Sequence, residues 1–112
     1  MGTYIPRKGE YISVSLDPQS GHEQKGRRPA LVVSNTLFNK HTGLVIACPL
    51  TNTARGYPFH VAVGEDAPVT GFIMVEQAKS LDFRARKARS IGHASAAVLE
   101  EVLALLDACL YE

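Results

Sequence analysis

The sequence predicts a small, mostly β protein of the α+β class, in which a strongly bent antiparallel barrel carries one helix packed across it. Short apolar or alternating segments recur at close spacing with turn residues between them, which is typical of bent antiparallel sheets. The last segment changes to the helical period. A length of 112 residues with 46% hydrophobic and 21% charged residues is enough to close one core, so we expect residues 1–112 to form a single domain.

Five segments carry the strand pattern. In chain order the predicted strands cover residues 10–16, 29–34, 44–50, 57–63 and 71–77. In the first of them Ile12, Val14 and Leu16 share one face and polar residues alternate with them, which predicts a half-buried strand. A turn through residues 39–43 should join the second strand to the third. Residues 81–89 allow either a short turn or a further strand.

The closing segment has apolar residues at helical spacing, with acidic residues elsewhere on the wheel, and Ser95 in front of it as an N-cap. The apolar positions are Val98, Leu99, Val102, Leu103, Leu105, Leu106 and Leu110. These leucines and valines should pack across the bent sheet, because an amphipathic helix must bury its apolar stripe. The chain shows no linker, repeat or low-complexity stretch.

The composition excludes several classes of protein. The longest apolar runs, such as residues 44–48, are too short to cross a bilayer, and the first residues lack an apolar signal region, so we expect a cytoplasmic protein without membrane contact. Cys48 and Cys109 lie far apart in apolar segments, which favours two small buried side chains over a disulfide or metal pair. Because no CxxC, HExxH or His/Cys cluster appears, the sequence predicts neither a metal site nor a cofactor.

The charge is unevenly distributed although its sum is only +1. Residues 1–94 hold 12 Lys and Arg against 7 Asp and Glu, a balance of +5, while residues 95–112 hold 4 acidic residues and no Lys or Arg. A basic body permits a polyanion such as nucleic acid as partner, although ordinary solvated surfaces show such asymmetry as well.

The loop of residues 21–29 concentrates groups that could cleave RNA. Scission by the 2′-hydroxyl needs a base, positive charge on the phosphorane oxygens and an acid for the leaving 5′-oxygen. Glu23, Arg28 and either His22 or Arg27 supply these types, and a guanidinium fork suits phosphate. Taken by itself, the same loop is also explained as a solvated hairpin, rich in charge because loops are.

Other polar groups could contact a nucleic acid. Thr51 follows a strand and could hydrogen-bond a phosphate oxygen, although such hydroxyls more often bond local backbone. The basic run 84–89, with Lys79 before it, could neutralise phosphates or simply face solvent. Tyr57 and Phe59 could stack on bases, but Phe59 is better explained as core.

Several blocks occur together in a fixed order. The longest covers residues 21–34 with the pattern G-x-E-Q-x-G-x-R-P-A-L-V-V-S. The others are Gly9-Glu10, Asp17-Pro18, Pro49-Leu50-Thr51, Gly56-Tyr57-Pro58-Phe59, Gln77-Ala78-Lys79-Ser80-Leu81, and Arg84-Ala85-Arg86 ahead of Gly92 and the closing helix. In these blocks the chain resembles the MazF/PemK-type toxins of type II toxin-antitoxin systems over nearly its whole length.

The resemblance implies a curved SH3-like barrel with a C-terminal helix, a homodimer and a cognate acidic antitoxin. It implies a metal-independent endoribonuclease without cofactors, which cleaves single-stranded mRNA at short motifs by 2′-hydroxyl attack, leaving 2′,3′-cyclic phosphate and 5′-hydroxyl ends. Arg28 matches the family's arginine before Pro-Ala, Thr51 its threonine and Glu23 its loop glutamate.

These matches set the expected roles. Arg28 would be the phosphate clamp and the acid, Thr51 would orient the scissile phosphate, and Glu23, or otherwise His22, would be the base. Further RNA contacts are expected from Gln24, Gln77 and Lys79. The resemblance leaves open the cleavage motif and which antitoxin is cognate.

A second hypothesis is a binding module. The same barrel could act on a protein target, as in the related gyrase-directed toxins, without any nuclease site. Such a toxin has no need for the combination of Glu23, Arg28 and Thr51, so these residues favour the nuclease.

Overall fold

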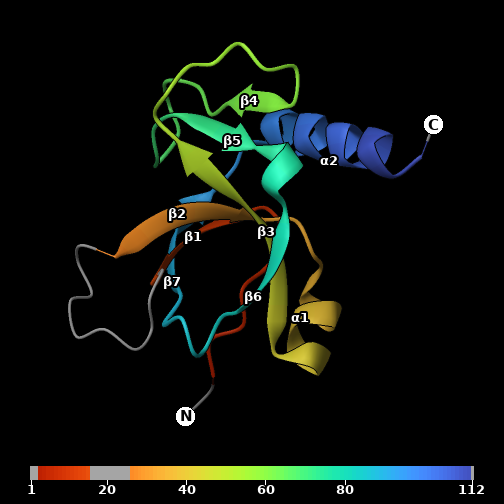
Figure 1. Ribbon diagram of the computed structural model, residues 1–112. Helices are drawn as coiled ribbons and strands as arrows, with labels where there is room; N and C mark the ends of the chain where they lie inside the picture. Colours follow the sequence, from red (N-terminus) through yellow and green to blue (C-terminus); the bar gives the residue numbers. More distant parts are fainter. Residues whose placement is uncertain (1–2, 16–25, 112) are drawn as a thin grey trace.

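The computed structural model describes residues 3–15 and 26–111 (Figure 1). In chain order its elements are β1 (Glu10–Ser15), β2 (Arg27–Val32), α1 (Thr36–Thr42), β3 (Leu44–Thr51), β4 (His60–Ala62), β5 (Phe72–Met74), the 3₁₀ helix η1 (Val75–Gln77), β6 (Lys79–Asp82), β7 (Arg89–His93) and α2 (Ala96–Leu110). The predicted class, short antiparallel strands followed by one long helix, is confirmed.

The strands form one antiparallel sheet in the order β4-β5-β3-β2-β1-β7. Strand β6 lies outside this path and pairs with the first half of β3, from Leu44 to Ala47. The other end of β3 pairs with β5 instead. Because β3 exchanges one neighbour for another along its length, the sheet is strongly curved. Within the described residues β4 and β7 do not pair with each other, so the expected barrel is a curved open sheet rather than a closed one.

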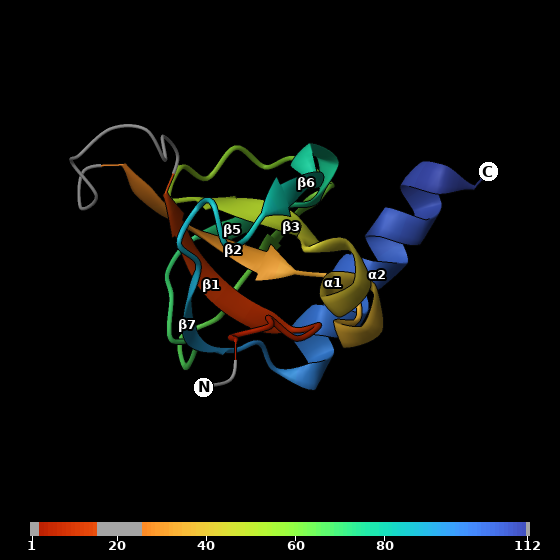
Figure 2. The same ribbon diagram turned by 90° about the horizontal axis from the view of Figure 1, so that it is seen from below.

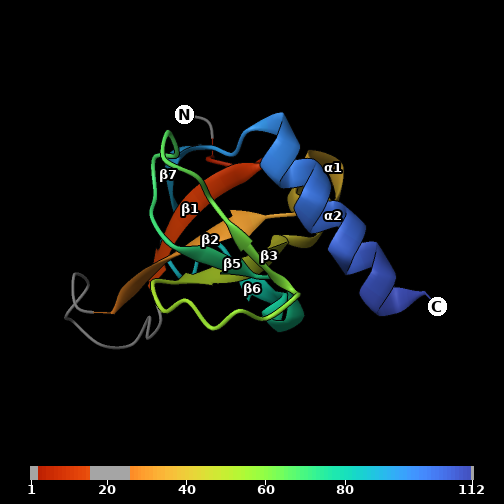
Figure 3. The same ribbon diagram turned by 90° about the horizontal axis from the view of Figure 1, so that it is seen from above.

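The curvature gives the sheet two apolar cores. One lies between the sheet and α2 and includes Tyr11, Leu31 and Val102, while the other lies under β6 and includes Ile12, Val14 and Phe83 (Figures 2 and 3). Both faces of β1 are therefore buried, and the prediction of a half-buried strand was wrong. A flat sheet would leave one face of β1 in water, whereas this curved sheet buries one face of β1 in each of the two cores.

Several element boundaries differ from the predictions. The segment 39–43, expected as a turn, ends a short helix, α1, which begins after the N-cap Asn35 and stops at Gly43 in the left-handed conformation. Strand β4 begins only at His60, and the predicted strand 71–77 divides into β5 and η1. The ambiguous segment 81–89 contains the end of β6, a turn and the start of β7.

Helix α2 follows its predicted cap, since the Ser95 side chain accepts a hydrogen bond from the backbone N–H of Val98. Its C-terminal half extends beyond the sheet (Figure 2), so Cys109 is exposed and the prediction of a buried thiol there was wrong. Cys48 is buried as expected, and this burial raises the pKa of its thiol to about 12. No described helix is long and apolar enough to cross a membrane.

Candidate functional site

A fork between β2 and β3 forms the centre of the candidate site. The two strands pair from Val32–Ala47 to Ala30–Pro49, and their ladder ends there. Pro29 and Pro49 have no N–H group, so neither can donate a ladder hydrogen bond at this point. Strand β3 then continues into its pairing with β5, and the two strands diverge (Figure 1).

The register of the ladder relates Arg28 to Thr51. In this antiparallel ladder each step back along β2 is matched by one step forward along β3. Two further steps beyond the pair Ala30–Pro49 would therefore place Arg28 opposite Thr51. The strands have separated by then, and between them lies a pocket of about 500 Å³. Its walls are formed by Arg27, Arg28, Pro29, Leu50, Thr51, Asn52 and Thr70. Two residues far apart in the sequence therefore share one pocket.

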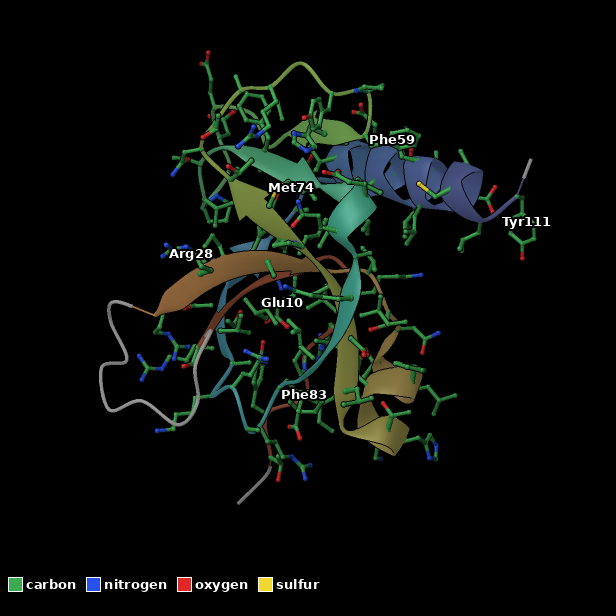
Figure 4. All side chains as sticks on the ribbon, in the orientation of Figure 1. Glu10, Arg28, Phe59, Met74, Phe83 and Tyr111 are labelled. Atoms are coloured by element: carbon green, nitrogen blue, oxygen red, sulfur yellow. The ribbon has the colours of Figure 1, made fainter. Side chains whose placement is uncertain are left out.

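Arg28 is the exposed cation of this pocket. Its side chain leaves β2 on the side of the β3 arrowhead (Figure 4). Nη1 donates to the carbonyl oxygen of Arg27 at 3.1 Å, and none of the described carboxylates forms an ion pair with the guanidinium. Most of its N–H donors are therefore available to an anion entering the pocket.

Thr51 is held in place by its neighbours. Its Oγ1 accepts a hydrogen bond from the backbone N–H of Thr53 at 3.2 Å, so the hydroxyl hydrogen remains available to a ligand. Gly71, with φ +107°, lies directly against it, because a Cβ at this position would come within 2.3 Å of the Thr51 carbonyl oxygen. The turn before β5 thereby fixes the position of the end of β3, and with it Thr51, in the pocket.

Arg27, the neighbour of Arg28, has a structural role instead. Its Nε donates to Ser13 Oγ at 2.8 Å, and its Nη2 donates to the carbonyl oxygens of Ser13 and Lys87, each at 2.7 Å. These contacts join β1, β2 and the turn between β6 and β7. The possibility that Arg27 supplies the catalytic cation is therefore not favoured, because its Nε and Nη2 already donate to groups of the fold.

A second, small hollow of about 30 Å³ extends the basic surface away from the pocket. Lys79 and Arg86 line it together with Arg28. Lys79 is exposed on β6, whereas Arg86 Nη1 donates to the carbonyl oxygen of Ser15 at 3.0 Å. Three cations, Arg28, Lys79 and Arg86, therefore line one hollow, which favours a ligand with more than one phosphate.

The remaining predicted site residues fall elsewhere. His22, Glu23 and Gln24 lie outside the described residues. Gln77 is exposed at the end of η1 and lines neither hollow. The structure thus brings together Arg28, Thr51 and Lys79 of the predicted set.

Two pocket residues were missing from the prediction, Asn52 and Thr70. Thr70 Oγ1 donates to Asn52 Oδ1 at 3.0 Å, across the end of β3. No sequence pattern marked them, because Thr70 lies in a loop that the sequence pattern could not place beside β3. The pairing of Arg28 with Thr51 could have been predicted from the sequence if a constant register between β2 and β3 had been assumed.

The aromatic pair is divided between surface and core. Phe59 packs against the core beneath α2, as predicted, while Tyr57 is exposed and its ring centroid lies 5.0 Å from that of His60. His60 is nearly buried and its Nε2 pairs with Glu76 at 2.9 Å. Tyr57 belongs to the loop before β4, and it lines neither of the hollows around Arg28.

Comparison with known proteins assigns this arrangement to a family. The chain is 42% identical over 106 residues to the endoribonuclease toxin ChpB of Escherichia coli strain K12, and 36% identical over 105 residues to the endoribonuclease toxin MazF of the same strain. These alignments cover 90% of both chains for ChpB and 93% of both chains for MazF.

Among solved structures, the fold resembles the MazE-MazF structure from Deinococcus radiodurans (Form-III), with a TM-score of 0.87 and 41% identity over 96% of this chain and 97% of that chain. Residues 7–110 match the profile of the PemK-like, MazF-like toxins of type II toxin-antitoxin systems. The chain therefore belongs to this toxin family.

Proposed function

We propose that the protein is the toxin of a type II toxin-antitoxin system and acts as an endoribonuclease on single-stranded mRNA, inhibiting translation and growth. The observation that carries this is the pocket in which Arg28, with no carboxylate partner among the described residues, faces Thr51 across the fork of β2 and β3. The relatives named as endoribonucleases support the reaction class.

The reaction follows from the pocket chemistry. The 2′-oxygen attacks the neighbouring phosphorus while its proton passes to a base, and the bond from phosphorus to the 5′-oxygen breaks. The products are a 2′,3′-cyclic phosphate and a 5′-hydroxyl end. Arg28 would donate parallel hydrogen bonds to the phosphorane oxygens, which carry more charge in the transition state than in the ground state, and would protonate the leaving oxygen.

Thr51 would orient the phosphate through its remaining hydroxyl hydrogen, since its oxygen already accepts from Thr53. Glu23 remains the proposed base, with His22 as the alternative; both lie outside the described residues. Because the 2′-hydroxyl is the nucleophile, DNA should bind without being cut. Lys79, Gln77 and Gln24 would contact neighbouring nucleotides.

A cognate acidic antitoxin is the proposed inhibitor. One similar solved structure is an endoribonuclease in complex with its cognate antitoxin, and the basic surface around Arg28, Lys79 and Arg86 suits carboxylates as well as phosphates. An extended acidic segment would cover this surface and exclude RNA. We place the reaction in the cytoplasm, where mRNA and an antitoxin are both available.

The proposed assembly is a homodimer. Leu110 is 73% exposed and Tyr111 is 70% exposed at the end of α2, which extends past the sheet. Apolar side chains grouped in this way favour a protein contact. Light scattering at micromolar concentration should give twice the mass of the chain, and a monomer mass would contradict the proposal.

The activity is tested by incubating the purified protein with a single-stranded RNA in EDTA. We expect the RNA to be cleaved at the same rate with and without EDTA, and the products to carry 2′,3′-cyclic phosphate ends. Loss of cleavage in EDTA with recovery in Mg²⁺ would contradict the metal-independent reaction. A protein that inhibits growth without cutting RNA would instead support the binding-module alternative, in which a protein target such as gyrase is poisoned.

A further inference from the structure

A third hollow opens beside Arg28 on the side away from Lys79. It has a volume of about 240 Å³, and the residues that it shares with the pocket proposed for the scissile phosphate are Arg27, Arg28, Pro29, Asn52 and Thr70. Because these residues line both spaces, a strand whose phosphate sits at Arg28 would place its neighbouring nucleotide in or next to this hollow. Nothing in the proposed reaction uses it.

The far wall of the hollow is apolar. Pro68, Val69 and Ile91 form it, from the loop before β5 and from β7. Ile91 is 37% exposed and belongs to neither of the two cores. Gly92 allows Pro68 to lie on β7, because a Cβ at position 92 would come within 2.8 Å of Pro68 Cγ. An apolar wall of this kind suits the face of a base, which is apolar and planar.

The near wall carries an oriented amide. Asn52 Oδ1 accepts the hydrogen bond from Thr70 Oγ1 at 3.0 Å, which leaves the two hydrogens of Nδ2 available as donors. Asn52 is exposed, and its side chain borders both the phosphate pocket and the hollow. An amide fixed at one end and open at the other can distinguish bases by the acceptors on their edges.

We propose that this hollow binds the base of the nucleotide next to the scissile phosphate. The apolar wall of Pro68, Val69 and Ile91 contacts the base face, and Asn52 donates to an acceptor on the base edge. Thr70 acts as a positioning residue for Asn52. The inference rests on the proposed function, because it takes the phosphate at Arg28 as its starting point, and it adds a determinant of sequence specificity to that function.

The test measures base preference by two routes. Oligonucleotides carry each of the four bases in turn at the positions flanking the cut. Their cleavage rates are compared, and in parallel the binding of versions with a 2′-deoxy sugar at the cut site, which cannot react, is measured. Base preference at each position is a ratio, so it is insensitive to a uniform loss of phosphate affinity.

Asn52→Ala should reduce the preference at one flanking position by about three- to tenfold, the range of one hydrogen bond. Asn52→Asp exchanges donors for an acceptor, so the preference at that same position should shift toward bases that present an amino group. Thr70→Val keeps the shape of the side chain but releases the amide, and it should relax the same position by a smaller factor.

Ile91→Ala should weaken binding of every oligonucleotide by roughly fivefold, because apolar contact area is lost, with the preference unchanged. Its control is Leu37→Ala, which removes an exposed aliphatic side chain from α1 and should change neither quantity.

The outcomes separate the two proposals. If the wild-type protein cleaves RNA but Asn52→Ala and Asn52→Asp keep its preference at every position, the base hollow is wrong and the nuclease stands. If the wild-type protein does not cleave, the proposed function fails, and the uncleavable oligonucleotides still decide whether base-dependent binding passes through Asn52. If every variant changed the base preference equally at all flanking positions, the proposal that this hollow binds a base would also be overturned.

Discussion

Arg27 and Arg28 are adjacent in the sequence and project to opposite faces of β2, and the two faces have different tasks. The guanidinium of Arg27 donates to Ser13 and Lys87 and holds three parts of the sheet together. Arg28 lines a pocket, and among the described residues its guanidinium donates to the carbonyl oxygen of Arg27. Because successive residues of a strand point to opposite faces, one arginine stabilises the fold and the other is available to a ligand. A charged group becomes available to a ligand where the structure gives it no partner of its own.

The largest expected effect is on catalysis at Arg28. Arg28→Ala should lower the cleavage rate by about 10²–10³, since it removes a charge contact that strengthens in the transition state. Its thermal unfolding should match that of the wild type, because no described ion pair is lost. Arg28→Lys should recover only part of the rate, as an ammonium cannot form the bidentate pair. A folded Arg28→Ala protein that cuts RNA normally would refute the assignment.

Arg27→Ala should give the reverse result. Removing three hydrogen bonds of a charged group leaves two carbonyl oxygens and one hydroxyl without their donor, so the free energy of unfolding should fall by roughly 2–3 kcal/mol. At a temperature where the variant remains folded, cleavage should decrease much less than in Arg28→Ala. Denaturant unfolding and single-turnover cleavage, measured on the same preparation, separate the two effects. A stable, inactive Arg27→Ala protein would reverse the roles given to the two arginines.

The other wall of the pocket depends on Gly71. Gly71→Ala should cost about 1–3 kcal/mol of stability and lower the cleavage rate, because the new Cβ would displace the Thr51 carbonyl. Gly64→Ala is the matched control, since Gly64 also has positive φ, at +91°, but no atom lies within 4 Å of its Cβ position. Cleavage at 15 °C, where both variants are folded, should fall only in Gly71→Ala. Equal loss in both would mean that backbone strain, and not the position of Thr51, limits the rate.

The sequence predicted the sheet and the helix because their patterns are local. Strands β1 and β3 and the cap at Ser95 follow from alternation, apolar runs and a serine before a helical repeat. Helix α1 was missed because it is short and its pattern is weak, although Asn35 and Gly43 are ordinary helix boundary residues. The two cores of β1 depend on how the sheet curves, and no single strand encodes that curvature.

The site was predicted in part for the same reason. The family blocks located Arg28 and Thr51, but the residues themselves could not show that Arg27 is used by the fold, because both arginines have the same chemistry. That distinction needs the register of β1 against β2, which places Ser13 within reach of Arg27. The contact of Asn52 with Thr70 joins residues 18 positions apart with β4 between them, and only the assembled sheet brings them together.

The smallest expected effect concerns the basic surface beyond Arg28, where Lys79 and Arg86 repeat the contrast of the two arginines. Arg86 contacts the Ser15 carbonyl, so its charge reversal would disturb the fold as well as the surface. Lys79 is exposed, and Lys79→Glu should leave stability unchanged. It should weaken RNA binding by roughly tenfold and lower the slope of log affinity against log salt by about one. The affinity for an acidic antitoxin segment should fall by a similar factor, because carboxylates and phosphates would use the same cation.

Titration of the toxin with such a segment, in the presence of an RNA with a 2′-deoxy sugar at the cut site, measures both affinities in one experiment. If the antitoxin acts by covering this surface, each ligand lowers the apparent affinity of the other, and Lys79→Glu weakens both. A ternary complex in which RNA affinity is unchanged at saturating antitoxin would show that inhibition works elsewhere on the molecule.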